Sequence, residues 1–377
     1  MTRIAQLANF YSTTSGGLRT AVDALGRGYV SAGYERLLLV PGPEDSVRET
    51  ENGAVMTFRA PLVGGNDYRM VVEPWRVREA LDRFRPTSIE VSDKTTMVLA
   101  AGWARRRGAR SVLLSHERLD SHLAPRIRWQ TGLRIGSSLV NRYLLRAFDQ
   151  VVVMSAFAAE EFRRVGGTSV VRVPLGVDLT TFHPGRRPSG TLQGLPKLLH
   201  VGRLSYEKRP DLAISAAVEL HRRGVPFDMD VYGDGPDREE LVRLAGDAPV
   251  TFHPHFTDRS ELAKRIAAAD VSLSVCPGET FGLAILEALA CGTPVVTADL
   301  GGGRELITPE CGAFAPATPA LLADAVLQVL ELPEVARREA ARDRAEQYPW
   351  SAAVDKMLEI HTTPRLSETA AGQARSG

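Results

Sequence analysis

Short apolar runs alternate with amphipathic stretches along most of the chain. An apolar run over 3–11 ends in a Ser-Gly-Gly turn, a stretch with helical spacing follows over 18–33, and a second apolar run covers 36–42. Strand, glycine turn, helix and strand in this order are typical of the βαβ unit of a parallel sheet. Further strands of this half are predicted at 87–93, 109–116 and 150–155, and residues 170–184 close the half.

The alternation stops at residues 184–197, which are dense in Pro, Gly and Ser, and then begins again. This break predicts a linker between two domains. After it the pattern predicts strands at 197–203, 227–236, 250–256, 271–277 and 294–299, with helices between them and a further helix from Pro319. We therefore expect an N-terminal domain over 1–183, a linker over 184–197 and a C-terminal domain over 198–348. A last amphipathic helix over 350–362 precedes a tail, 363–377, whose Ser, Ala and Gly content predicts disorder.

Several of the predicted strands are apolar along their whole length, which is typical of parallel strands covered by helices on both faces. The fold class is thus α/β, with two doubly wound, Rossmann-like parallel-sheet domains that face a cleft between them. Ligands of such sheets bind beyond the carboxyl ends of the strands. The loops that follow the strands are therefore the places to search for function.

Composition narrows the class of protein. The 377 residues, 44% hydrophobic and 24% charged, fit an ordinary globular protein of two domains. We find no signal peptide and no apolar run long enough to cross a membrane. Cys276, Cys291 and Cys311 are odd in number and lack the spacing of metal ligands, which favours a reducing cytoplasm.

Charge is unevenly distributed along the chain. Residues 1–185 carry 25 Lys and Arg against 18 Asp and Glu, and residues 101–146 hold ten arginines but only two acids, Glu117 and Asp120. A basic region of this kind favours an anionic partner such as a phospholipid surface or a nucleic acid. The alternative is a solvated arginine-rich face without a partner.

Two loops carry candidate phosphate ligands. Gly16 and Gly17 lie between the first strand and the first helix, where backbone N–H groups and a helix N-terminus can approach a phosphate. The dinucleotide pattern GxGxxG is absent, so a simple tight turn remains an alternative. Arg203 and Lys208, one of only five lysines, follow the first strand of the second half and could hold a diphosphate. A solvated loop is the alternative here.

Residues 278–296, GETFGLAILEALACGTPVV, place Glu279 and Glu287 eight positions apart. Eight residues of helix rise about 12 Å, whereas the two carboxyls of a glycosidase lie about 5–10 Å apart. The spacing suits two contacts on one extended ligand. Amides of Phe281, Gly282 and Leu283 could bind an anion between them. This layout predicts a nucleotide sugar, with sugar hydroxyls on Glu279 and ribose on Glu287. The alternative is two ordinary helix glutamates, although burying Glu287 without a partner would be costly.

The remaining polar motifs predict no metal site. Asp228 and Asp230 have the spacing of a divalent-metal motif but begin a strand, which favours a structural role. His253 and His255 could be metal ligands, but they lie at the end of the strand predicted at 250–256, and we assign them to the region where the strand passes into a loop that lines a nucleobase pocket. His116 ends a strand of the first half and points toward the predicted cleft, where it could contact the sugar or phosphate; a structural role is the alternative.

Taken in order, the segments GRLSYEK, VYGDGP, ETFGLAILEALACGTPVV and GGGREL resemble the donor domain of the retaining family-4 glycosyltransferases of GT-B fold. The resemblance implies that Arg203 and Lys208 hold the donor diphosphate and that Glu279 and the amides of 281–283 hold the sugar. It also implies that Glu287 binds the ribose, and that Gly16, Gly17 and His116 lie near the phosphate and sugar. The residues implied to be catalytic are Arg203, Lys208, His116 and Glu279. A front-side reaction without cofactor or metal is implied. The resemblance also implies that the last helix, 350–362, crosses back onto the N-terminal domain.

The N-terminal half is similar to actinobacterial mannosyltransferases that use GDP-mannose and phosphatidylinositol mannosides, as seen in QLANFYSTTSGGLRTAVDALG, EVSD and LLSHERLD. The resemblance implies an anionic glycolipid acceptor and a peripheral position on the cytoplasmic face of the membrane. The mixture of arginine and apolar residues over 126–148 suits such a surface, and an ordinary helix with solvated arginines is the alternative. The candidate contacts are Arg126, Arg128, Trp129 and Arg134.

Two positions depart from the family pattern: Arg209 stands where Gly often follows the Glu-Lys pair, and Arg304 stands where Pro is expected.

Other functions also remain open. A UDP-sugar could replace GDP-mannose. A nucleotide-sugar 2-epimerase would share the architecture but needs an acid–base set at C2. A non-catalytic sugar-nucleotide sensor would have the ribose-binding Glu287 but would lack the cations that bind the phosphates, whereas this sequence has both Arg203 and Lys208. No recognised nucleic-acid module accompanies the basic region.

Overall fold

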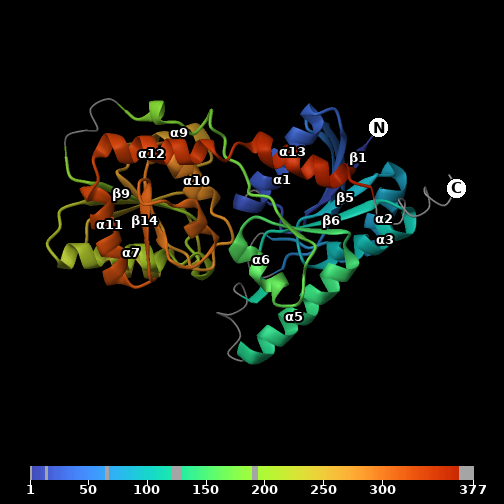
Figure 1. Cartoon of the computed structure of the whole chain (residues 1–377), viewed down its shortest axis with the longest axis horizontal. Coiled ribbons are helices and arrows are strands. Elements are labelled where there is room, and N and C mark those ends of the chain that lie inside the picture. The colour runs from blue at the N-terminus through green and yellow to red at the C-terminus, as the bar shows by residue number, and fades with distance from the viewer. Residues whose placement is uncertain (1, 13–15, 64–67, 121–129, 189–193, 365–377) are drawn as a thin grey trace. The chain divides into compact units, whose positions relative to one another are not determined.

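The computed structural model describes residues 2–12, 16–63, 68–120, 130–188 and 194–364. The chain divides into two compact units, an N-terminal unit of residues 1–174 with 350–377 and a C-terminal unit of residues 175–349 (Figure 1). The division falls at Pro174–Leu175, before the predicted linker of 184–197, so residues 175–183 belong to the C-terminal unit. Most of the predicted tail lies outside the described residues.

The N-terminal unit is built on a sheet whose described strands follow the order β3-β4-β2-β1-β5-β6-β7-β8. Its pairs are parallel except β3 with β4. The strands are β1 (Arg3–Leu7), β2 (Glu35–Gly42), β3 (Ser46–Thr50), β4 (Gly53–Arg59), β5 (Ser88–Val91), β6 (Arg110–Ser115), β7 (Gln150–Val153) and β8 (Val170–Arg172). The helices are α1 (Gly16–Ser31), α2 (Pro74–Phe84), η1 (Thr96–Leu99), α3 (Ala100–Arg107), α5 (Gln130–Ala147), α6 (Ala156–Arg163) and α13 (Trp350–Thr362).

The hairpin of β3 and β4 was not predicted, and it makes this sheet mixed rather than wholly parallel. Strand β3 is an edge strand of sequence SVRET, in which four of the five residues are exposed. An edge strand with polar residues on both faces has no apolar run and no clear alternation, so the signals used to find the other strands are missing.

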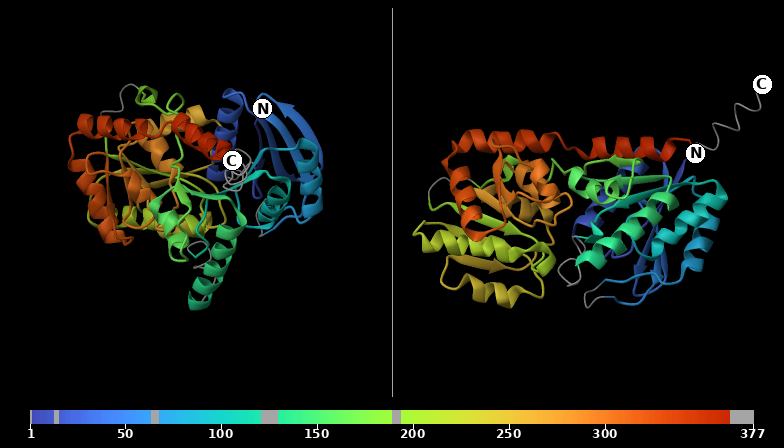
Figure 2. Two further views of the ribbon diagram at one scale, coloured as in Figure 1. Left: turned by 45° about the vertical axis from the view of Figure 1, so that its right-hand side comes forward. Right: turned by 60° about the horizontal axis from the view of Figure 1, so that its bottom comes forward.

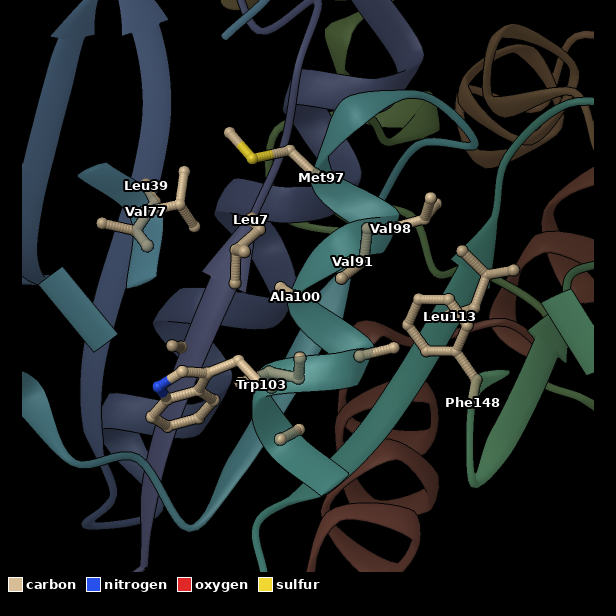
Figure 3. Packing of buried hydrophobic residues seen from close by; sticks show 14 of the residues in the cluster. Leu7, Leu39, Val77, Val91, Met97, Val98, Ala100, Trp103, Leu113 and Phe148 are labelled. Carbon is tan, nitrogen blue, oxygen red and sulfur yellow. The ribbon is translucent and has the colours of Figure 1, made fainter. Parts of the chain in front are cut away.

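A hydrophobic core joins the sheet of the N-terminal unit to α2, η1 and α3 (Figure 3). Leu7, Leu39, Val91 and Leu113 extend from neighbouring parallel strands and are almost completely buried. Trp103 of α3 packs against this layer, and its indole Nε1 donates a hydrogen bond to Asp82 Oδ1 at 2.9 Å. Apolar strand residues therefore form the packed core. Polar residues that could bind a ligand are left to the loops at the ends of the strands.

The C-terminal unit contains a parallel sheet of order β11-β10-β9-β12-β13-β14. Helices α7 and α11 pack together on one face, and α9, α10 and α12 cover the other (Figure 1). The strands are β9 (Lys197–Val201), β10 (Asp228–Tyr232), β11 (Val250–His253), β12 (Val271–Ser274), β13 (Val295–Ala298) and β14 (Gly312–Ala315). The helices are η2 (Pro184–Arg186), η3 (Tyr206–Lys208), α7 (Pro210–Arg222), α8 (Arg238–Ala245), α9 (Arg259–Ala268), α10 (Leu283–Ala290), η4 (Gly302–Leu306), α11 (Pro319–Glu331) and α12 (Glu334–Glu346).

Helix α13 is the last described element, yet it packs on α1 near the start of the chain. The two helices approach closely at Gly28, where a Cβ atom would lie 2.2 Å from a methyl group of Val354. Only glycine permits this contact without a shift of the neighbouring helix. Within the described residues no helix is long and apolar enough to cross a membrane.

A buried polar network fixes α13 to the sheet. His361 of α13 lies between Ser88 and Glu90 of β5, with Nδ1 2.8 Å from Ser88 Oγ and Nε2 3.1 Å from Glu90 Oε2. Tyr29 of α1 donates to Glu90 Oε2 at 2.6 Å, and Gln6 of β1 donates to Glu90 Oε1 at 2.8 Å. Burial by itself raises the pKa of Glu90, but His361, Tyr29 and Gln6 outweigh it and hold that pKa below its ordinary value.

Replacing His361 by alanine should destabilise the N-terminal unit by about 3 kcal/mol, because it leaves the buried Glu90 carboxylate without its hydrogen-bond partner on α13. Urea denaturation at pH 7 measures this change in the free energy of unfolding. Lys356→Ala, which removes an exposed ion pair with Glu359 on the same helix, is the control and should change that free energy by less than about 0.5 kcal/mol. A cost below about 1 kcal/mol for His361→Ala would show that the network does not stabilise the unit.

Candidate functional site

The candidate site in the C-terminal unit lies where two neighbouring parallel strands end. Strand β9 leads into Gly202 and Arg203, and β12 leads into the loop that precedes α10. Because β9 and β12 pair directly and in parallel, their carboxyl ends meet at one edge of the sheet. The fold thereby brings together residues that are about 70 positions apart in sequence.

Lys208 and Glu279 form an ion pair at this edge. Lys208 Nζ donates to Glu279 Oε2 at 2.8 Å, and their side chains are 45% and 20% exposed. The Glu279 carboxylate also accepts hydrogen bonds from the backbone N–H groups of Phe281 and Thr280. Burial by itself raises the pKa of Glu279, but the Lys208 charge and these hydrogen bonds hold it below the ordinary value. The carboxylate is therefore ionised at neutral pH and acts as a hydrogen-bond acceptor.

Arg203 adds a second cation to the loop after β9. Its Nη1 lies 3.8 Å from Glu207 Oε1, and the Arg203 side chain is 24% exposed. Burial raises the pKa of Glu207, but a side-chain hydrogen bond from Ser205, the Glu207 backbone and the nearby cations lower it overall. The loop thus presents Arg203 and Lys208 with an ionised Glu207 between them in sequence.

The Glu279 loop is held from the other side by the glycines that follow β13. The N–H of Gly302 donates to Glu279 O at 2.6 Å. Gly301 has a φ of +98°, and a Cβ atom there would lie within 3.1 Å of the carbonyl oxygens of Pro277 and Glu279. A side chain at Gly301 would therefore displace the loop that carries Glu279.

The start of α10 differs in detail from the sequence-based expectation. Gly282 is the N-cap residue, with φ of 103°, and the helix begins at Leu283, so the Leu283 N–H belongs to the first turn and has no acceptor within the helix. The Phe281 N–H donates to the Glu279 carboxylate, and the Phe281 ring is buried against Tyr348. The predicted anion site at 281–283 is thus partly used to orient Glu279, because the acid lies directly before its own helix.

Glu287 lies inside α10, among residues that are almost all buried, and it has a partner that sequence reasoning missed. Arg259, the first residue of α9, places Nη2 2.7 Å from Glu287 Oε1. Burial is the main cause that raises the pKa of Glu287, with a smaller contribution from Asp178, while Arg259 opposes the rise. No spacing or motif links residues 259 and 287, so only the packing of α9 on α10 reveals this pair.

The remaining candidates belong to the N-terminal unit. Gly16 and Gly17 are the first residues of α1, are exposed, and a Cβ atom on Gly16 would meet nothing within 4 Å. His116 follows β6, and burial of its ring lowers its pKa to about 4, so it is neutral at pH 7. Arg134 is exposed on α5. The predicted contacts Arg126, Arg128 and Trp129 lie outside the described residues.

The aspartate–histidine motif of the C-terminal unit forms a compact cluster. His253 Nε2 lies 2.6 Å from Asp230 Oδ1, and its ring stacks on Tyr232 with centroids 4.5 Å apart. The backbone N–H of His255 donates to Asp234 Oδ2 at 3.0 Å. Asp230 is thus held by a histidine from the neighbouring strand, and the described residues contain no group of three or more His, Cys, Asp or Glu that could hold a metal ion. The nucleobase pocket at this loop stays a prediction.

Comparison with solved structures shows the class of fold. The whole chain is similar to sucrose-phosphate synthase from Thermosynechococcus elongatus, with a TM-score of 0.77, 23% identity and coverage of 96% of this chain and 98% of that one. It is also similar to the Anabaena protein HepE, solved with UDP and glucose, with a TM-score of 0.73, 18% identity and coverage of 95% and 98%. Two α/β units of this kind are those of the GT-B fold.

Comparison of sequences then shows the family. Residues 185–348 match the model of the family described as glycosyl transferases group 1, and residues 16–176 match the glycosyl transferase 4-like domain. A GDP-mannose-dependent alpha-(1-6)-phosphatidylinositol dimannoside mannosyltransferase of Mycobacterium tuberculosis (strain ATCC 25177 / H37Ra) is 42% identical over 94% of this chain and 95% of its own length. The chain belongs to this group 1 family of glycosyltransferases. The resemblance inferred from the motifs is confirmed.

Replacing Glu279 by alanine is expected to lower the rate of glycosyl transfer by at least about 100-fold, because it removes the acceptor that Lys208 and two backbone amides hold in place. The measurement is the initial rate of transfer at saturating donor, with circular dichroism and thermal unfolding to check the fold. Glu331→Ala, an exposed glutamate at the end of α11, is the control and should behave as wild type. Unchanged activity of Glu279→Ala would contradict the assignment of the site.

Proposed function

We propose that this protein transfers mannose from GDP-mannose to a hydroxyl group of a phosphatidylinositol mannoside, with retention of the α configuration. The observation that carries the proposal is the likeness to the mycobacterial mannosyltransferase, because it extends over both units. The N-terminal unit of such an enzyme selects the acceptor and the C-terminal unit binds the donor, as the resemblance implies. A likeness confined to one unit would support only one of the two substrates.

The donor half of the proposal assigns each polar group at the strand ends to one part of GDP-mannose. Arg203 and Lys208 bind the diphosphate, Glu279 accepts hydrogen bonds from mannose hydroxyls, and Glu287 accepts them from the ribose. The ion pair of Lys208 with Glu279 at 2.8 Å supports a single continuous site, because adjoining parts of the donor would contact both residues.

The chemistry of the proposal follows from these charges. The bond between the anomeric carbon and the diphosphate oxygen breaks while the acceptor oxygen bonds to the same face of that carbon. The acceptor proton passes to the leaving diphosphate. Because the acceptor oxygen attacks the anomeric carbon directly, no protein carboxylate acts as nucleophile. Arg203 and Lys208 stabilise the negative charge on the leaving group. Neutral His116 positions the sugar through a hydrogen bond, since its low pKa keeps it uncharged at pH 7.

Donor selectivity tests the proposal. We expect transfer and slow hydrolysis of GDP-mannose, with rates at least about 100-fold lower for UDP-glucose and UDP-N-acetylglucosamine, because a site that hydrogen-bonds one base rejects another. The coupling constant of the anomeric proton in the product should identify an α-mannoside. Activity should persist in EDTA, since the proposed site takes its positive charge from Arg203 and Lys208. Turnover of a UDP-sugar with GDP-mannose inert would overturn the donor assignment. Conversion of the donor without acceptor into its 2-epimeric nucleotide sugar, rather than into free sugar and nucleoside diphosphate, would indicate an epimerase.

The acceptor half of the proposal places the N-terminal unit on the cytoplasmic face of an anionic membrane. Helix α5 packs on α6 and β7 of its own unit, and its N-terminal end projects beyond them in the left view of Figure 2. Its buried residues Ser137, Asn141 and Leu144 face that unit. Its large exposed apolar residues are Ile135, Leu139, Val140 and Tyr143, with exposed fractions of 56%, 59%, 39% and 51%.

Spacing along α5 places three of these residues on one face of the helix. Ile135, Leu139 and Tyr143 follow each other at intervals of four, so they lie on one face of the helix, opposite its buried residues. Exposed Arg142 and Arg146 lie on the same face. Apolar side chains beside arginines are typical of helices that lie in the interface of an anionic bilayer. A solvated helix would gain nothing from exposing four large apolar side chains.

The double variant Ile135→Glu, Leu139→Glu should lower binding to vesicles of phosphatidylcholine with 30 mol% phosphatidylinositol by at least about 10-fold, because two apolar side chains no longer enter the interface. Co-sedimentation measures the partition coefficient. Val335→Glu, at an apolar residue of α12 that is 70% exposed, is the control and should bind as wild type. Equal binding of the double variant and wild type would overturn the assignment of α5.

A further inference from the structure

Arg259 occupies an unusual place at the start of α9. The helix is capped by Asp258, whose carboxylate accepts the N–H of Ser260 at 2.8 Å, and Arg259 is the first helical residue. A cation in the first turn opposes the helix dipole and costs α9 about 0.3–1 kcal/mol. The local sequence therefore gives no reason for an arginine at this position. A reason must come from what the side chain contacts.

The Arg259 side chain contacts Glu287 and Phe182. Its Nη2 donates to Glu287 Oε1 at 2.7 Å, and its Cζ lies 4.9 Å from the centroid of the fully buried Phe182 ring. Stacking on the ring fixes the plane of the guanidinium group, and the hydrogen bond then fixes the rotation of the Glu287 carboxylate. Two contacts from different elements thus orient one acid.

The geometry leaves the other oxygen of Glu287 open for a ligand. None of the described residues forms a hydrogen bond with Oε2, and the Glu287 side chain retains 12% exposure. An ionised carboxylate can accept about four hydrogen bonds through its two oxygens, and Arg259 uses one of them. Vicinal hydroxyl groups are the donors that such a partly occupied carboxylate can bind.

The charges around Glu287 make Arg259 its necessary counterion. Burial raises the pKa of Glu287, and the carboxylate of Asp178 raises it further. Arg342, from the helix α12 that packs on α10, donates to the carbonyl oxygens of Ala290 and Phe182 rather than to Glu287. Arg259 is the residue that opposes the rise and favours the carboxylate form.

We propose that Arg259 is a positioning residue of the donor site, which holds Glu287 ionised and turned toward the ribose. It thereby sets a preference for a ribonucleoside diphosphate over its 2′-deoxy counterpart. The inference rests on the proposed function, in which Glu287 binds the ribose of the donor. If the ion pair only joined α9 to α10, it would stabilise the unit, and its loss would change the affinities for both nucleotides equally.

Calorimetric binding of GDP and 2′-deoxy-GDP to the full chain separates these roles. Wild type should bind GDP about 10-fold to 100-fold more tightly, since a hydrogen bond to a charged group contributes about 1.5–3 kcal/mol. Arg259→Gln should weaken GDP binding about 10-fold and leave 2′-deoxy-GDP binding nearly unchanged, so that the preference is largely lost. Arg265→Gln is the matched control, because Arg265 lies on the same helix and pairs with Glu261 at the surface.

The pH dependence of binding gives a second readout. Without Arg259, Glu287 takes up a proton at a higher pH, so as the pH is lowered the affinity of Arg259→Gln for GDP should begin to fall at a higher pH than that of wild type. Titration of the GDP phosphate affects both proteins and cancels in the comparison. Arg259→Lys, which keeps the charge, should restore the wild-type pH profile and only part of the ribose preference.

The outcomes distinguish the inference from the function on which it rests. Suppose that wild type binds GDP. If Arg259→Gln then lowers the affinity for both nucleotides equally, or changes neither affinity, the positioning role is wrong and the donor assignment stands. If wild type binds neither nucleotide, the donor assignment fails and the inference fails with it. Thermal unfolding of each variant checks the fold, and Arg259→Lys provides the test if Arg259→Gln does not fold.

Discussion

A carboxylate removed from water must be accompanied by a cation or by hydrogen bonds, and the candidate site depends on this constraint at two positions. Glu279 is matched by Lys208 from the loop after β9, and Glu287 is matched by Arg259 from α9. Each cation comes from a different segment of the chain, so the two ion pairs can form only when β9, α9 and α10 have packed together. The site and the C-terminal unit are in this sense stabilised by the same contacts.

The N-terminal unit uses the same device to join segments that are distant in sequence. Glu90 is held by Tyr29 and by His361, which lies 271 positions further along the chain. Lys94 and Glu161 form a second buried pair, with a further hydrogen bond to Glu161 from Asn141 of α5. The carboxyl ends of the central strands and the base of the exposed helix α5 are therefore connected by buried polar contacts.

The structure shows what the two residues that depart from the family pattern contact. Arg209, where glycine is often found, adopts a left-handed conformation with φ of 51°, which costs a side-chain residue about 1–2 kcal/mol. Its guanidinium group forms a bidentate ion pair with Asp211, which offsets part of this cost. Arg304, at the position expected for proline, places its guanidinium 4.3 Å from the Phe314 ring. Both arginines thus have partners outside the groups assigned to the donor.

The sequence by itself determined the two α/β units and most of their strands, and it singled out Arg203, Lys208, Glu279 and Glu287 as candidates, because apolar runs and strand-end motifs are local patterns. It did not predict the hairpin of β3 and β4 or strand β14, whose short polar or Gly-Ala segments carry no such pattern. Only the tertiary structure paired Arg259 with Glu287, turned the Phe281 amide toward Glu279, and exposed the apolar face of α5. These features depend on which elements pack together. No motif or spacing in the sequence relates residues 259 and 287, so their contact cannot be predicted from the sequence.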